Sequence, residues 1–435
     1  MADLKVNFAG IQCPNPYWLA SGPPTNTYIQ VAKAFDLGWG GAVWKTVGEP
    51  ILNVFSRYGS IDLGPTRMVG FNNIELISDR PIEDNLREIA EVKRKYTGNA
   101  VIVSLMVETN RESWHDIVKR AQDTGADGLE LNFGCPHGMS ERGMGAAVGQ
   151  DPGYTRDIVS WVKEVAKIPV IVKLTPNITD ITSVARAAVK GGADAISLIN
   201  TINSIVGVDL DTFTPLPNVG GKSSHGGYCG PAVKPIALNM LSATAGDPEV
   251  GIPISGIGGI ATWRDAAEFI SLGAGTVQVC TAAMHYGFRI IDDLCDGLSN
   301  WMDEKGYKSV EEICGRAVSK VTKWENLDLN YHLIAVIDQE KCIRCELCWA
   351  ACEDGAHQAI RRLPREFGGP VVEIIDEACV GCNLCSQVCP VQGCITMHEL
   401  PVKESPVTWK QYQAGQGTLA PRGDAVHTAH WAPHV

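Results

Sequence analysis

The sequence has few of the features that mark nucleic-acid-binding, membrane or exported proteins. Its 37 Lys and Arg residues are outnumbered by 49 Asp and Glu residues, which gives a formal net charge of −12. A protein that follows a phosphate backbone normally carries an excess of positive charge, so nucleic acid is not an expected partner. No apolar run approaches the ~18–20 residues that span a bilayer, which excludes a membrane protein. The first residues have no basic or apolar stretch of a signal peptide, so we expect a cytoplasmic protein.

Cysteine, by contrast, is abundant, and its distribution argues against disulfides. Structural disulfides are rare in a reducing compartment. Eight of the 15 cysteines lie between Cys342 and Cys389, as two copies of one spacing with a period of 37 residues. Such clustering indicates metal binding.

Residues 1–300 alternate short β-branched runs with longer amphipathic stretches, which is typical of βα units around a parallel sheet. Eight strands are predicted: Tyr17–Ala20, Ala42–Lys45, Val101–Met106, Gly128–Asn132, Val170–Leu174, Ala195–Asn200, Pro253–Gly256 and Thr276–Cys280. Helices are predicted at Ile82–Lys95, Trp114–Thr124, Thr155–Ala166, Ile181–Lys190 and Trp263–Leu272. Eight such units fit an α/β fold of the TIM (βα)8 type better than an open sheet.

The composition of the rest of the chain indicates four further segments. Residues 5–15 are expected to form a small hairpin at the bottom of the barrel, and residues 301–335 a helical bridge. Residues 336–400 hold the two cysteine runs and predict a small α+β ferredoxin-like domain. Residues 401–435 are predicted to be an extended tail. Its histidines (His427, His430 and His434) are not accompanied by ligand-spaced Cys or acidic residues, so a metal site there is the less favoured interpretation.

The two cysteine runs have the spacing of [4Fe–4S] ligands. In two-cluster ferredoxins the fourth cysteine of each run binds the other cluster. One cluster is therefore assigned to Cys342, Cys345, Cys348 and Cys389, and the other to Cys379, Cys382, Cys385 and Cys352. Glu353 stands where the second run has Pro390, which changes a turn but not a ligand. Two zinc sites are the alternative, but these runs are much rarer for zinc.

The C-terminal ends of barrel strands carry the chemistry in this fold. The residues expected to contact a cofactor there are Ala20, Ser21, Lys45, Thr46, Asn110, Asn132, Lys173, Asn200, Gly258, Gly259, Cys280 and Thr281. Lys45 and Lys173 lie in apolar strands, where an ammonium group requires a counter-anion. A flavin supplies negative charge twice, through its phosphate and its reduced ring, so we expect FMN.

The segment Gly256–Ala261 matches a G-x-G-x-x-A pattern after a strand, which would suggest a dinucleotide site. No acidic residue ends the next strand to bind a ribose, so we favour a phosphate cup instead. Gly258 and Gly259 would bring backbone N–H groups to the FMN phosphate, and Cys280 and Thr281 would complete the cup. If nicotinamide is the electron partner, another polypeptide binds it.

A glycine-rich loop follows the strand that ends at Asn132, as expected of an active-site lid. Cys135 in this loop is the predicted proton donor to a substrate on the flavin, and His137 either assists it or caps the loop. The predicted substrate-binding residues are amides and one hydroxyl: Asn73, Asn110, Asn132, Asn200 and Thr201. Such groups suit a neutral cyclic amide or imide such as uracil, whereas a carboxylated ring would require a further cation.

The sequence also resembles a known family. The segments Asn132–Met139, Glu141–Gly145, Gly149–Pro152, Lys173–Asn177 and Gly70–Ser78 resemble the dihydropyrimidine dehydrogenases. Within that family the resemblance is to the PreA type, in which a dihydroorotate-dehydrogenase-like FMN barrel precedes a two-cluster ferredoxin domain. The resemblance covers about residues 3–400 in order.

The resemblance implies reversible reduction of the 5,6 double bond of uracil or thymine. It implies that Cys135 is the general acid, that the strand-end asparagines and Thr201 hold the pyrimidine, and that the lysines hold FMN. It also implies a PreT-type partner subunit that carries FAD and binds NAD(H), in a heterotetramer. Two alternatives remain open at this point: a dihydroorotate dehydrogenase-like enzyme and a non-catalytic electron-transfer subunit.

Overall fold

A computed structural model describes residues 2–49, 57–136, 143–329, 331–365, 367–401 and 406–417. The chain forms two compact units, Met1–Val321 and Thr322–Val435, each with its own core. His137 and the three tail histidines lie outside the described residues. No described helix is both long and apolar enough to cross a membrane.

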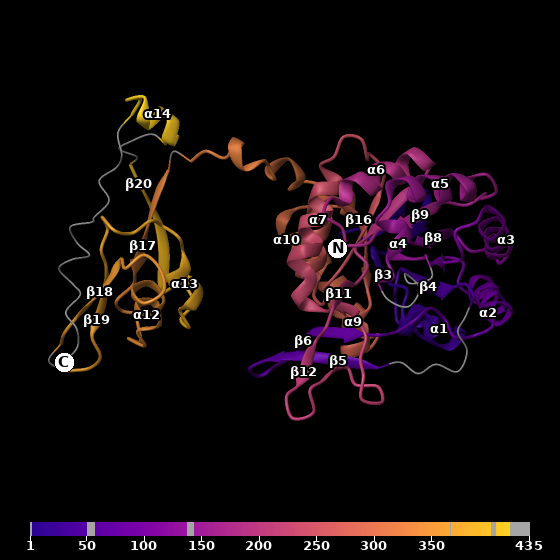
Figure 1. The fold of residues 1–435 in the computed structure, drawn as a ribbon, viewed down its shortest axis with the longest axis horizontal. Helices are drawn as coiled ribbons and strands as arrows, with labels where there is room; N and C mark the ends of the chain where they lie inside the picture. The colour runs from indigo at the N-terminus through magenta and orange to yellow at the C-terminus, as the bar shows by residue number, and fades with distance from the viewer. Residues whose placement is uncertain are drawn as a thin grey trace. The chain divides into compact units, whose positions relative to one another are not determined.

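The first unit is built on a closed parallel barrel with the strand order β10-β15-β16-β3-β4-β7-β8-β9 (Figure 1). Its strands are β3 (Tyr17–Leu19), β4 (Gly41–Val47), β7 (Ala100–Leu105), β8 (Gly128–Asn132), β9 (Val170–Lys173), β10 (Ala195–Leu198), β15 (Ile254–Ile257) and β16 (Ala274–Val279). All eight predicted strands are present, and the TIM-type fold is confirmed. The strands are almost entirely buried because helices cover their outer face.

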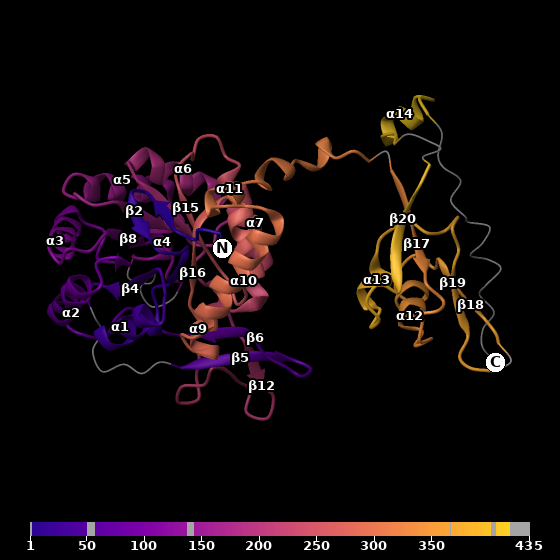
Figure 2. The ribbon, with the colours of Figure 1, turned by 180° about the vertical axis from the view of Figure 1, so that it is seen from behind.

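Helices surround the barrel, and the views from both sides show them around the strands (Figure 2). They are α1 (Tyr28–Asp36), α2 (Ile82–Lys95), α3 (Arg111–Gln122), α4 (Ala146–Gly149), α5 (Pro152–Lys163), α6 (Ile181–Gly191), α7 (Lys234–Ala245), α8 (Trp263–Ser271), α9 (Thr281–Tyr286), α10 (Ile290–Lys305) and α11 (Val310–Ile313). Short polar side chains such as Asp180 and Thr262 cap their first turns. Gly192, in the left-handed conformation, ends α6.

Two lysine–aspartate pairs lie at corresponding points of the chain, just before β8 and just before β10. Asp127, just before β8, accepts hydrogen bonds from Lys93 Nζ (2.7 Å) and the backbone N–H of Val101 (2.8 Å). Asp194, just before β10, accepts from Lys163 Nζ (2.7 Å) and Val170 N–H (2.8 Å) in the same way. These bonds tie helices to the N-terminal ends of the strands. The hairpin of β1 (Val6–Phe8) and β2 (Ile11–Cys13) packs into the same core.

The loops after β4 and β10 together form an antiparallel sheet outside the barrel. Its order is β11-β14-β6-β5, made from β5 (Tyr58–Leu63), β6 (Thr66–Asn73), β11 (Ile202–Ser204) and β14 (Gly226–Cys229). The hairpin of β12 (Gly207–Asp209) and β13 (Thr214–Leu216) lies beyond β11, and both views show β12 near β5 and β6 (Figures 1 and 2). This sheet follows strand C-termini, so it lies on the side where a barrel carries its site.

The second unit is a small α+β module. It contains β17 (His332–Ile337) paired with β20 (Ile395–Leu400), β18 (Ile360–Leu363) paired with β19 (Val371–Ile374), and the helices α12 (Leu347–Glu353), α13 (Leu384–Val388) and α14 (Trp409–Gln413). The expected bridge at 301–335 is divided: α10 runs to Lys305, α11 packs in the first unit, and β17 begins at His332. Part of the expected extended tail is helical, because Thr408 caps α14.

Candidate functional site

A cleft opens at the C-terminal ends of the barrel strands, between them and the outer sheet. It encloses about 1320 Å³ of space, including the part open to solvent. Strand ends and outer-sheet residues both line it, including Lys45, Asn132 and Tyr228.

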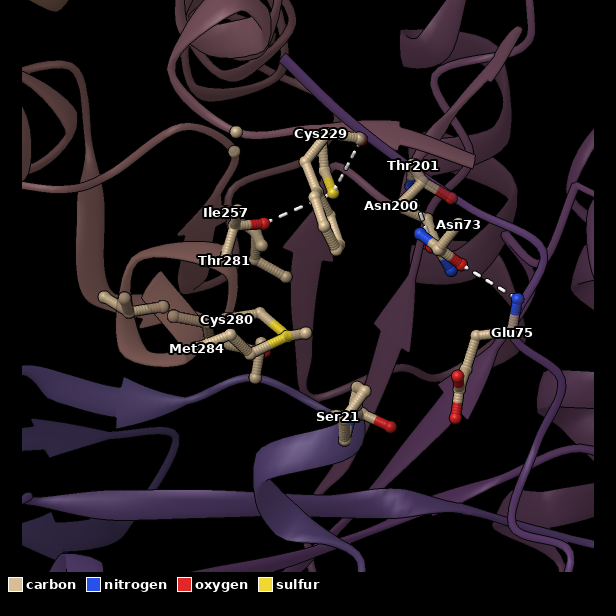
Figure 3. A pocket seen from close by; sticks show the side chains of 18 of the residues that line it. Ser21, Asn73, Glu75, Asn200, Thr201, Cys229, Ile257, Cys280, Thr281 and Met284 are labelled. Atoms are coloured by element: carbon tan, nitrogen blue, oxygen red, sulfur yellow. Dashed lines mark hydrogen bonds between the residues drawn. The ribbon is translucent and has the colours of Figure 1, made fainter. Parts of the chain in front are cut away.

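The structure brings almost all the predicted site residues to this cleft. Those that line it are Ala20, Ser21, Lys45, Thr46, Asn73, Asn132, Cys135, Lys173, Asn200, Thr201, Gly258, Gly259, Cys280 and Thr281. Figure 3 shows Asn73 beside Asn200 and Thr201, with Cys280 and Thr281 on the other side of the cleft.

Asn110 is the exception. It does not line the cleft, and its Oδ1 accepts a hydrogen bond from the backbone N–H of Ser113 (2.9 Å) at the start of α3. An asparagine in this position satisfies a helix N-terminus. The prediction that Asn110 contacts cofactor or substrate is therefore not supported by its position, because its carboxamide oxygen caps a helix.

Both buried lysines already have protein counter-ions. Lys45 pairs with Glu75, whose other carboxylate oxygen accepts a hydrogen bond from Tyr58 (2.7 Å). Lys173 Nζ lies 3.4 Å from Glu130 Oε1. The expectation that these lysines need an anionic ligand for their burial is thus too strong, because two carboxylates supply the negative charge.

A chain of amides and hydroxyls joins three strand ends. Asn200 Nδ2 donates to Asn132 Oδ1 (2.9 Å), and Asn132 Nδ2 donates to Thr46 Oγ1 (3.0 Å). The oxygen of Asn200 accepts from the N–H of Thr201 (2.8 Å). On the outer sheet, Asn73 Nδ2 donates to the carbonyl of Gly227 (3.0 Å). The carboxamides are therefore held in fixed orientations and bear no charge.

Cys135 lies at the base of the predicted lid and is 8% exposed. It packs with Ile77, Met106 and Met144, and its carbonyl accepts from the N–H of Ala146 (3.0 Å). Two other thiols line the cleft, and burial raises the pKa of Cys229 to about 11 and that of Cys280 to about 12. These two thiols are thus held protonated at neutral pH.

The loop Gly258–Thr262 follows β15 with an unusual backbone. Gly258 and Gly259 have φ of +130° and +77°, and a Cβ on Gly259 would lie 2.9 Å from the carbonyl of Gly230. Asp265 holds the far end of the loop by accepting from the N–H groups of Ala261 (3.0 Å) and Thr262 (2.8 Å). Because Gly258 and Gly259 carry no side chains and Asp265 holds the end of the loop, this backbone suits close approach of a phosphate.

One buried polar atom at the cleft bears on whether a flavin would fit. Gln278 lines the cleft, and its Oε1 is buried with no hydrogen-bond partner in the described residues. A buried acceptor of this kind suits a ligand N–H, such as the imide N–H of an isoalloxazine ring. Together with two ammonium groups and the glycine loop, this donor and acceptor set fits FMN.

The cysteines of the second unit surround two separate cavities. Cys342, Cys345, Cys348 and Cys389 line one, and Cys352, Cys379, Cys382 and Cys385 line the other. This is the crossed division predicted from the spacing. No group of three or more His, Cys, Asp or Glu side chains in the described ranges is arranged to hold a single metal ion. Thiols around a cavity suit a cubane better than a zinc ion. Cys394 lies in the core of this unit and also lines the first cavity, as a fifth cysteine.

Sequence reasoning missed the carboxylates and their neighbours. Tyr58 begins β5 of the outer sheet and Glu75 follows its strand β6; that sheet was not predicted, whereas Glu130 lies in a strand that was. The signal for Glu130 was present, because a single acid in the apolar strand Gly128–Asn132 requires a buried partner.

Comparisons with known proteins agree with both units. Residues 3–302 match the dihydroorotate dehydrogenase family, and residues 335–397 match the 4Fe-4S dicluster domain. The chain is 43% identical over 412 residues to subunit PreA of NAD-dependent dihydropyrimidine dehydrogenase from Escherichia coli, covering 93% of this chain and 99% of that one. It is 42% identical over 337 residues to the chloroplastic dihydropyrimidine dehydrogenase (NADP(+)) of Arabidopsis thaliana, covering 75% and 79%. It is 37% identical over 315 residues to the catalytic subunit of dihydroorotate dehydrogenase B (NAD(+)) of Pyrococcus abyssi, covering 72% and 99%.

Proposed function

The chain belongs to the dihydroorotate dehydrogenase family and is an oxidoreductase with a 4Fe-4S dicluster domain, and from this premise we propose that it reversibly reduces the 5,6 double bond of uracil or thymine. The observation that carries the proposal is the uncharged ring of carboxamides at the cleft. Asn73, Asn132 and Asn200 line the cleft, and a carboxamide offers both donors and acceptors without charge, which suits the C=O and N–H edge of a pyrimidine.

The chain's own residues would divide the work as follows. Asn73, Asn132 and Asn200, with Thr201, hold and orient the pyrimidine. Lys45 and Lys173 place ammonium groups beside the cofactor, and the Gly258–Gly259 backbone receives its phosphate. When bound, FMN would collect electrons one at a time from the clusters and deliver them to C6 of the pyrimidine as hydride. The Cys135 thiol gives its proton to C5, so that the ring gains one hydride and one proton, and the thiolate recovers a proton from solvent.

The electron source is proposed to be a separate subunit. PreA of Escherichia coli is named as a subunit of an NAD-dependent enzyme. In this chain the G-x-G-x-x-A pattern at Gly256–Ala261 is better explained as a phosphate cup than as a dinucleotide site. We therefore propose a PreT-type partner with FAD and NAD(H), acting in a cytoplasmic heterotetramer. Its electrons would pass through the two [4Fe–4S] clusters to the barrel.

Dihydroorotate oxidation is a second candidate, since the Pyrococcus abyssi relative is named for it. Recognition of its carboxylate calls for a free cation. Among the described residues that line the cleft there is no arginine, and both lysines pair with glutamates. This favours the uncharged substrate.

The test is an anaerobic titration of the purified full chain with dihydrouracil, followed by its visible spectrum. Bleaching of stoichiometric FMN by dihydrouracil, and not by dihydroorotate, is the expected result. Bleaching by dihydroorotate alone would move the assignment to the second candidate. Protein without FMN would indicate a non-catalytic electron-transfer subunit.

A further inference from the structure

Glu130 is a carboxylate in the interior of the barrel with a side chain that has 0% exposure. Its Oε2 accepts hydrogen bonds from Ser197 Oγ (2.8 Å) and Gln278 Nε2 (3.1 Å). Four steps around the closed sheet separate β8, which carries Glu130, from β16, which carries Gln278. The bond between them therefore crosses the barrel interior, and the carboxylate is fixed from opposite walls.

Lys173 stands between this carboxylate and the cleft. The lysine lines the cleft, whereas Glu130 is not among the lining residues. Lys173 Nζ lies 3.4 Å from Glu130 Oε1, and its side chain is 6% exposed. The other ammonium group differs, because both Lys45 and its partner Glu75 line the cleft. Of the two carboxylates, Glu130 is therefore the one that does not line the cleft itself, although its lysine does.

The charges of this pair have opposite effects on a ligand in the cleft. The ammonium group stabilises negative charge there, and the carboxylate behind it opposes that effect at a slightly greater distance. In a buried environment the two contributions are screened far less than in water. The two hydrogen-bond donors to this carboxylate, Ser197 and Gln278, are neutral, so its negative charge offsets part of the attraction that Lys173 would exert on the ligand.

We propose that Glu130 is a positioning residue for Lys173 and that its charge lowers the reduction potential of the flavin bound in the cleft. The inference rests on the proposed function only in requiring that the cleft holds FMN. Reduction adds negative charge to the flavin ring, and Glu130 disfavours that charge. The reduced cofactor is consequently a stronger hydride donor to a pyrimidine than Lys173 alone would make it.

The experiment is a measurement of the FMN midpoint potential in the full chain without pyrimidine, by anaerobic titration against reference dyes. Flavin-depleted protein provides the spectrum of the clusters for subtraction. Glu130→Gln retains the shape and a hydrogen-bond acceptor but removes the charge. We expect its ratio of reduced to oxidised flavin at a fixed potential to rise about tenfold, which is about 30 mV for a two-electron couple.

Two further variants make the result decisive. Ser197→Ala removes one hydrogen bond to the carboxylate and keeps its charge, so its ratio should stay within about twofold of the wild type. Glu130→Gln leaves Lys173 buried without a counter-charge, which can prevent this variant from folding. A second comparison is therefore made between Lys173→Gln and the double variant Glu130→Gln/Lys173→Gln. The double variant should show the higher ratio of reduced to oxidised flavin.

Equal potentials with and without Glu130 in both comparisons would overturn the proposal, as would a shift in Ser197→Ala as large as that in Glu130→Gln. The failure of the proposed function is separate: a wild-type chain that binds FMN but is not reduced by dihydrouracil would leave these potentials unaffected.

Discussion

Asn200 Nδ2 donates a hydrogen bond of 2.9 Å to Asn132 Oδ1, which joins the residues that follow β10 to the end of β8. Asn132 in turn donates to Thr46 Oγ1, and Thr46 is 2.9 Å from Ser104 Oγ. The orientation of each carboxamide is thus determined by its neighbour. The wall of the cleft presents a fixed pattern of donors and acceptors before any substrate arrives.

Asn200→Ala should weaken pyrimidine binding while FMN content stays near stoichiometric. The substitution removes one substrate contact and leaves Asn132 Oδ1 with a single donor, the N–H of Gly134 at 3.2 Å. Loss of a buried hydrogen bond of about 1–3 kcal/mol corresponds to roughly a 5–150-fold increase in KM. Steady-state kinetics with uracil provide the measurement. Asn203→Ala, at an exposed position of β11, is the control and should leave KM unchanged.

Cys135→Ala should retain FMN and both clusters but reduce the rate of pyrimidine reduction by about 10²–10⁴-fold, because a general acid is lost. Rapid-mixing measurements of flavin oxidation by uracil would report the step directly. Cys314→Ala changes a thiol whose pKa is raised by burial and which lies outside the cleft, so its rate should match the wild type. A normal rate in Cys135→Ala would assign the proton to another group.

The fold was predicted well because it depends on local patterns. Each barrel strand is a short, mostly apolar run, and the cluster ligands follow from the spacing of the cysteines along the chain. The pairing of Glu130 with Gln278 could not be read in this way, since it depends on which strands face each other after the barrel closes.

Asn110 and the outer sheet illustrate two further limits. A strand-end asparagine suits a substrate contact and a helix cap equally, and only the path of the chain into α3 decides between them. The outer sheet joins β6 to β14 across more than a hundred residues, and neither strand shows a regular alternation of buried and exposed positions. Glu75 and Tyr58 depend on that sheet, and so they were missed.

Gly259→Ala should weaken FMN binding. The residue has φ of +77°, and a Cβ there would lie 2.9 Å from Gly230 O and from atoms of Lys234. The loop must therefore shift, and the backbone groups proposed to meet the phosphate shift with it. Fluorescence titration of FMN into flavin-depleted protein should show at least a tenfold weaker Kd.

Gly251→Ala is the matched control for that experiment. Gly251 also has a positive φ, of +56°, but a Cβ there would meet nothing within 4 Å. It should cost about 1 kcal/mol of stability through left-handed strain and leave the Kd for FMN unchanged. Equal FMN affinities in the two variants would mean that the Gly259 loop does not contact the cofactor.

Asp265→Asn should destabilise the barrel at neutral pH, and the effect should diminish in acid. Burial tends to raise the pKa of Asp265, but hydrogen bonds from Lys234 and from Ala261 and Thr262 outweigh it, and the pKa is lowered overall. The folded state then binds the proton less readily than the unfolded state. The carboxylate stabilises the fold above its unfolded pKa of about 4, and this contribution is lost as pH falls through the lower folded pKa.

The free energy of unfolding, followed by tryptophan fluorescence at pH 7 and below pH 4, tests this prediction. A capping carboxylate of this kind contributes about 1–2 kcal/mol at pH 7. The gap between the unfolding free energies of wild type and Asp265→Asn should narrow as the pH falls. A gap that is independent of pH would exclude an electrostatic role for Asp265.

Substitution of the fourth cysteine in each run should remove the cluster assigned to the other run. Cys389 lines the cavity of Cys342, Cys345 and Cys348, although it is the last cysteine of the second run. Cys389→Ala should therefore lower the iron content from about eight to about four per chain and leave the cluster of Cys379, Cys382 and Cys385 intact. Iron analysis, with EPR of the reduced protein, is the measurement, because the loss of one cluster also removes the magnetic coupling between the two.

Cys394→Ala is the matched control, since Cys394 lines the same cavity without belonging to either run. It should retain about eight irons, and a loss of four irons in Cys394→Ala rather than in Cys389→Ala would assign the fourth ligand to Cys394.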